Sequence, residues 1–186
     1  MNRISFRRSR LALAATAAFV FAGSAMAATM NKAAYEAGRQ RIVASYEADR
    51  KACSQTSGDA QDLCLARAAG KEKVARAQLA FDRSGKASDH HALAVAMADA
   101  DESVAQQACK AKAGQARDVC QAEAKATHTK ALADATLARK VGRARTDAMS
   151  DKRDAEYQLA DEKCDSLAGD AKTACTDSAK TRYGKR

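Results

Sequence analysis

The sequence predicts an all-α protein, an elongated antiparallel array of three helical hairpins, each closed near its turn by a disulfide. The pattern Cys-x4-Gly-x5-Cys occurs three times, at residues 53–64, 109–120 and 164–175, so that successive copies start 56 and 55 residues apart. The 186 residues include no proline, and the segments between the copies are rich in Ala, Glu, Lys, Arg and Gln, which favour helices. A period this regular indicates a repeated supersecondary unit.

The glycine inside each copy, Gly58, Gly114 or Gly169, is predicted to form the turn of its hairpin. Glycine takes positive φ at little cost and often follows the last residue of a helix. Asp59 and Asp170 come directly after two of these glycines, and aspartate is a preferred N-cap. We therefore expect one helix to end at each glycine and the next to begin at the residue that follows.

The two cysteines of each copy lie at matching heights in such a hairpin, five residues before the turn glycine and six after it. Their Cα atoms can then approach to about 5.5 Å, the usual separation in a disulfide. Six cysteines allow about fifteen connectivities, and the repeat favours the three local pairs, which are Cys53 with Cys64, Cys109 with Cys120 and Cys164 with Cys175. The alternative is that these are buried free thiols.

The first 27 residues are predicted to be a secretory signal peptide. Four arginines and no acidic residue precede residue 11, an apolar run covers 11–23, and small residues at 25 and 27 form a cleavage site, with cleavage expected after Ala27. The alternative, an uncleaved membrane anchor, is disfavoured because the apolar run is short and rich in alanine, so no stable membrane insertion is expected after cleavage. We expect a periplasmic location, and an oxidising compartment suits disulfides.

The remaining chain is divided into hairpin 1 (28–87), hairpin 2 (88–142) and hairpin 3 (143–186), which has a short last helix and a polar tail. Six helical segments are expected, at 29–57, 59–83, 89–113, 115–141, 143–168 and 170–183. In the first, Tyr35, Ile42, Val43 and Tyr46 recur at helical spacing. The stretch 84–89 is the clearest linker, with Ser88 or Asp89 as the next N-cap. Gly142 either breaks the chain or only weakens a continuous helix, since a lone glycine costs about 1 kcal/mol.

The predicted core is thin. After residue 27, Leu, Ile, Val and Phe together number 16 of 159 residues, and alanine buries little apolar area per contact. Each disulfide adds up to about 3 kcal/mol in the chain-entropy model, so the disulfides are expected to decide whether the hairpins stay folded. With no Trp and few Phe or Tyr, a deep small-molecule site is not expected, and no cofactor is predicted.

Charge and motifs disfavour nucleic-acid binding and catalysis. Without the four arginines of the predicted signal peptide, the formal charge falls from +9 to +5. Basic residues alternate with acidic ones, as in Lys71-Glu72-Lys73, instead of forming the basic stripe that nucleic acid requires. No Gly-rich phosphate loop, G-x-S-x-G elbow or H-E-x-x-H motif occurs. We expect a non-enzyme that does not bind nucleic acid.

A metal site is a weaker hypothesis. His90 and His91, with Asp89, could supply ligands for zinc, copper or nickel, together with more distant side chains, which are Asp99, Asp101, Glu102 and His128. Adjacent histidines at a helix start point in different directions, however, so polar linker residues are the favoured explanation and no metal is predicted.

The third copy, Cys164-Asp-Ser-Leu-Ala-Gly169-Asp-Ala-Lys-Thr-Ala-Cys175, resembles a stretch found in small, exported, Ala/Lys-rich helical proteins of Gram-negative bacteria. The resemblance covers the signal peptide and the repeat, and it implies a periplasmic location. It implies no catalytic or binding residues. Three functions are considered: a structural or stress-related envelope protein with weak contacts to several partners, a holdase that binds unfolded clients, and a metal or redox sensor. Self-association is left open.

Overall fold

The computed structural model describes residues 30–185, and within that range all of the regular secondary structure is α-helical. This confirms the predicted all-α class. The five helices are α1 (Lys32–Cys53), α2 (Gly58–Ser84), α3 (Ala87–Cys109), α4 (Gly114–Cys164) and α5 (Gly169–Tyr183). The predicted signal peptide, with its cleavage site at Ala27, lies outside the described residues.

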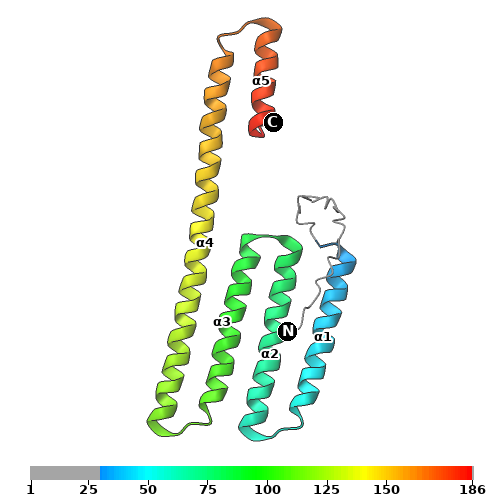
Figure 1. Cartoon of the computed structure of the whole chain (residues 1–186), viewed down its shortest axis with the longest axis vertical. Helices are drawn as coiled ribbons and strands as arrows, with labels where there is room; N and C mark the ends of the chain where they lie inside the picture. The colour runs from blue at the N-terminus through cyan, green and yellow to red at the C-terminus, as the bar shows by residue number, and fades with distance from the viewer. Residues whose placement is uncertain (1–29, 186) are drawn as a thin grey trace, which may run out of the picture.

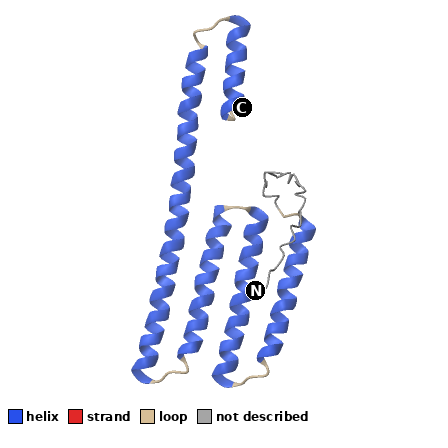
Figure 2. Ribbon diagram, in the orientation of Figure 1, coloured by secondary structure: helices blue, strands red, loops and turns tan. Residues whose placement is uncertain are grey.

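Helices α1 to α4 lie side by side in one row, and α4 continues far beyond the row before α5 folds back beside its far end (Figure 1). Each helix contacts only the helices next to it in sequence, so α1 packs on α2, α2 on α3, α3 on α4 and α4 on α5. Short loops join consecutive helices (Figure 2). Because each helix has at most two neighbours, much of its surface faces solvent.

The long helix α4 differs from the six-segment prediction. It comprises 51 residues and passes through Gly142 without a break, which makes it about 76 Å long at about 1.5 Å per residue. A Cβ added at Gly142 would meet no atom within 4 Å. The glycine therefore weakens the helix without ending it, and the expected fifth and sixth segments are the second half of α4 and α5.

Three turns contain the repeat, and each is closed by a disulfide. The Cα–Cα separations are 5.5 Å for Cys53–Cys64, 5.7 Å for Cys109–Cys120 and 5.6 Å for Cys164–Cys175. The connection between α2 and α3 is not closed in this way and consists of Gly85 and Lys86 alone. It is shorter than the linker expected over 84–89, because Gly85 takes a left-handed conformation directly after α2 and α3 starts at Ala87, before either expected N-cap.

The turn glycines have positive φ, at 59° for Gly58, 51° for Gly114 and 57° for Gly169. Their place in the turn differs from the expectation, because each is the first residue of the following helix. The preceding helix ends at the cysteine, where in the first turn Thr56 donates a hydrogen bond to the carbonyl of Cys53. Local side-chain bonds of this kind compete with the helical pattern.

The aspartates that follow two of these glycines are not N-caps, which corrects the prediction. The N-cap positions are occupied by Ser57 and Ala168, and neither side chain makes a capping bond. Since each helix already begins at its glycine, Asp59 and Asp170 fall in the first turn. There the negative charge interacts favourably with the positive end of the helix dipole.

The core is made of small side chains. The fully buried side chains of largest volume are Cys53, Cys109 and Cys164, one from each disulfide. Most of the other buried apolar residues between 30 and 185 are alanines, with Leu93 the one leucine among them. Close packing also depends on Gly70 of α2, where an added Cβ would lie 2.9 Å from the Cβ of Ala100 on α3. This core is as thin as the composition predicts.

Candidate functional site

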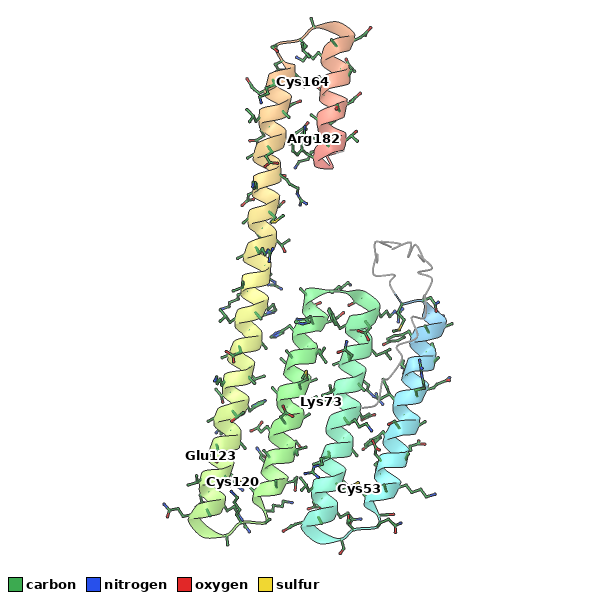
Figure 3. All side chains as sticks on the ribbon, in the orientation of Figure 1. Cys53, Lys73, Cys120, Glu123, Cys164 and Arg182 are labelled. Carbon is green, nitrogen blue, oxygen red and sulfur yellow. A yellow bond between two sulfur atoms is a disulfide. The ribbon has the colours of Figure 1, made fainter. Side chains whose placement is uncertain are left out.

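The cysteines provide no reactive thiol. All six lie in the described part of the chain and all are paired in disulfides. A nucleophilic or metal-binding cysteine needs a thiolate, so in the oxidised protein these residues act through the geometry that they impose. In Figure 3, Cys53 and Cys164 mark two of the three disulfide-closed turns, which lie at opposite ends of the molecule.

His90 and His91, the weak metal candidates, contact different neighbours. The ring of His90 packs edge-on against Phe81, with 5.0 Å between ring centroids. The Nδ1 atom of His91 lies 3.2 Å from the backbone carbonyl oxygen of Ala135 on α4. Among residues 30–185, no group of three or more His, Cys, Asp or Glu side chains is arranged to hold a metal ion. The two histidines thus help to pack the start of α3 against its neighbours.

The third histidine belongs to a polar cluster that the sequence did not reveal. His128 of α4 places Nε2 2.8 Å from Asp99 Oδ1 and Nδ1 3.0 Å from Glu102 Oε2, both on α3. Lys73 of α2, labelled in Figure 3, extends the cluster with Nζ 2.6 Å from Asp99 Oδ2. We call these four residues the polar latch, because they join three consecutive helices.

Both ring nitrogens of His128 face carboxylate oxygens, and only the doubly protonated imidazolium can donate to both. The hydrogen bond from Lys73, and next the one from His128, hold the pKa of Asp99 below its usual range. The side chain of His128 is 18% exposed, so its contacts with the two carboxylates are partly shielded from water. Because both ring nitrogens are already engaged, the latch is a structural connection and has no open ligand position.

From the sequence alone, His128, Asp99 and Glu102 are expected only as scattered metal candidates. Their meeting could have been found by counting from the disulfide that joins Cys109 to Cys120. Asp99 and Glu102 lie ten and seven residues before Cys109, and His128 lies eight residues after Cys120. In antiparallel helices joined at that pair, these positions come to the same height.

The concave features of the described surface are open grooves. One of about 570 Å³ runs between α1 and α2, where apolar Tyr35, Val43 and Leu79 alternate with charged side chains. The charged members of its lining are Glu36, Arg39, Glu47 and Arg76. A groove with this lining suits a transient contact with a chain segment better than an enclosed small molecule.

The middle of α4 is one of the most exposed parts of the described chain. Every residue from 140 to 149 is exposed, and in Figure 3 this part of α4 has no other helix beside it. Of the eight large apolar side chains that are strongly exposed, five lie on α4, and these are Val119, Leu137, Val141, Met149 and Leu159. A helix surface of this kind is a candidate for contact with another molecule.

No protein-family model, curated protein or solved structure matches the chain. None of the described helices combines the length and apolar character needed to cross a membrane. Any assignment of function therefore depends on the chemistry of the surfaces described above.

Proposed function

We propose that this chain is a non-enzymatic, exported protein of the periplasm or cell envelope, which acts as an extended helical scaffold through weak contacts with several partners. In this proposal the three disulfide-closed hairpins form an elongated antiparallel array. Three disulfides favour an oxidising compartment, in agreement with the signal peptide expected from residues 1–27. The resemblance to exported Ala/Lys-rich proteins of Gram-negative bacteria agrees with the same location.

The observation that carries the proposal is the unbroken run of exposed residues from 140 to 149 in the middle of α4. A helical segment without a packing partner inside its own chain gains little from tertiary contacts, although such contacts usually stabilise helices. Here apolar Val141 and Met149 are exposed among basic and acidic side chains. Mixed surfaces of this kind bind weakly and in a salt-dependent way.

Photo-crosslinking in the exporting cell tests the proposal. A photoreactive amino acid at Thr146, in the exposed stretch, is expected to capture several envelope proteins, and captures should decrease as salt is raised. The matched control is the same amino acid at Gln115, an exposed position at the disulfide-closed start of α4. Equal capture at both positions, or no capture at Thr146, would contradict a scaffold role for this stretch.

A holdase function is the second candidate, and the eight large, strongly exposed apolar side chains favour it. Unfolding clients would lie along the α1–α2 groove and the exposed side of α4. The test is suppression of the aggregation of a heated client by the oxidised protein at low salt. Failure to protect at stoichiometric excess would exclude the holdase and leave the scaffold.

We do not extend the proposal to metal sensing. His90 and His91 contact different neighbours, and both ring nitrogens of His128 already face carboxylates. Redox sensing would require one of the disulfides to be reduced and re-formed in use, and we assign the three disulfides a structural role in closing the turns.

A further inference from the structure

The side of α4 that faces away from α3 and α5 carries an apolar stripe, which is interrupted between Ala148 and Ala155 next to Asp151 and Lys152. It consists of Leu137, Val141, Ala144, Ala148, Ala155 and Leu159, all of them exposed. At 3.6 residues per turn, these six positions fall within about 60° of one another around the helix axis. We call this set the α4 stripe.

The α4 stripe is separate from the surfaces that hold the fold together. The buried residues of α4 are Ala124, Ala135 and Cys164, and they lie about 140–180° around the helix from Leu137. Helices α3 and α5 both pack on that buried side, so a partner on the stripe would meet neither of them. Leu137 is 60% exposed and Leu159 is 58% exposed, so no part of the described chain covers the two ends.

The apolar pattern is nearly symmetric about Ala148. Leu137 lies eleven residues before it and Leu159 eleven after it, while Val141 and Ala155 each lie seven residues away. A second copy of the helix running in the opposite direction would place Leu137 of one chain against Leu159 of the other. The alanines near the centre would allow the two backbones to approach closely.

The charges of the two halves are opposite. Residues 137–146 include four basic side chains and no acidic one, whereas residues 147–159 include four acidic and two basic ones. The charged side chains nearest the stripe are basic Lys140 and Arg145 in the first half and acidic Asp147, Asp151 and Glu156 in the second. Arg139 instead lines a groove with α3, and Asp154 pairs with Lys185. Antiparallel pairing brings the basic half of one helix against the acidic half of the other, and parallel pairing brings like charges together.

We propose that the α4 stripe binds a second copy of this chain, with the two α4 helices antiparallel and crossing near Ala148. Leu137 and Leu159 are about 33 Å apart along the helix, and alanine contributes little area, so the dimer is weak and reversible. This pairing does not depend on the envelope or client contacts proposed above.

Sedimentation equilibrium of the purified, oxidised protein from about 1 μM to 1 mM measures the pairing. The wild-type chain is expected to show a monomer–dimer equilibrium, and Leu137→Ser with Val141→Ser should weaken it at least tenfold. Both side chains are exposed, so the monomer keeps its circular dichroism spectrum. The matched control, Val43→Ser at an exposed position on α1, should change the dissociation constant less than twofold.

Charge reversal and crosslinking test the direction. Lys140→Glu with Arg145→Glu should weaken the homodimer, and mixing this variant with a chain carrying Asp147→Lys and Asp151→Lys should restore association. A photoreactive amino acid at Leu137 should crosslink to the peptide of the second copy that contains Leu159. A monomer across the whole concentration range, a crosslink from 137 to 137, or capture only of other proteins in the envelope would overturn the proposal.

Discussion

The contribution of the disulfides can be measured most sharply at α5, the shortest helix. Its 15 residues are marginal as an isolated helix, and its contacts are few. Ala179 is its one buried residue, the rings of Tyr157 and Tyr183 meet edge-on at 6.4 Å, and Lys185 Nζ lies 2.6 Å from Asp154 Oδ1. An edge-on aromatic pair contributes about 1 kcal/mol and an exposed ion pair less.

Replacing both Cys164 and Cys175 by serine removes a link between residues 11 apart in sequence. The chain-entropy model gives about 3 kcal/mol for a loop of this size, which exceeds what the remaining contacts contribute. We expect the free energy of opening α5 to fall by that amount, which corresponds to a rise of roughly 100-fold in its open population.

Hydrogen exchange followed by mass spectrometry measures this opening. Amides of residues 169–183 should lose protection in the double variant, while those of α1 to α3 keep it. The matched control, Cys53→Ser with Cys64→Ser, should affect α2 less, because α2 also packs on α3 through Gly70. If α5 keeps its protection without its disulfide, the reasoning that the disulfides compensate for a thin core is wrong.

Three further outcomes are expected. Gly70→Ala should lower the free energy of unfolding, measured in urea, by about 1–3 kcal/mol, because the new Cβ would overlap Ala100. Gly142→Ala should instead raise the free energy of unfolding by about 0.5–1 kcal/mol, because an alanine there meets no atom. Equal effects of the two variants would contradict the packing of α2 on α3. His128→Ala should cost about 1 kcal/mol in the same assay, since the contacts of the ring with Asp99 and Glu102 are lost; an unchanged urea midpoint would mean that the latch does not hold in solution. Because the pKa of Asp99 is lowered in the folded protein, the unfolded chain binds more protons at this carboxylate. The stabilisation from ionised Asp99 is therefore complete above its ordinary pKa of 3.8 and is lost as the pH falls through the lower folded pKa. In an acid titration, Asp99→Asn should lose helical ellipticity less steeply than the wild-type chain, and an identical titration would refute this.

The sequence predicts the repeated parts of this protein well, because each is specified locally. The spacing from Cys53 to Cys64 predicts a helix, a turn and a second helix, and the structure places a disulfide there and at the other two copies. The predicted position of Gly58 within its turn was wrong, because Gly58 begins α2. A positive φ is required at that residue, but the cysteine pattern does not determine whether the residue follows one helix or begins the next.

Two features could not be read from local pattern. Gly142 is an ambiguous signal for a helix end. The cost of about 1 kcal/mol for a glycine inside a helix can be outweighed by the good helix formers on either side, and α4 continues through it. The polar latch joins Asp99 to His128, which are 29 residues apart, and their meeting depends on the register that the disulfide between Cys109 and Cys120 sets. Charged residues in a sequence as polar as this one do not reveal their partners without that register.

Disulfide mapping of the purified, exported protein tests whether the three turns are closed covalently. Intact mass under non-reducing conditions, followed by proteolysis and identification of linked peptides, reports both the number of disulfides and their pairing. We expect a chain lighter than the reduced form by the two hydrogens of each of three disulfides, with peptides linked only as Cys53–Cys64, Cys109–Cys120 and Cys164–Cys175. Free thiols or links between different repeats would contradict this pairing. The helical hairpins would then lack the covalent closures that we propose stabilise them.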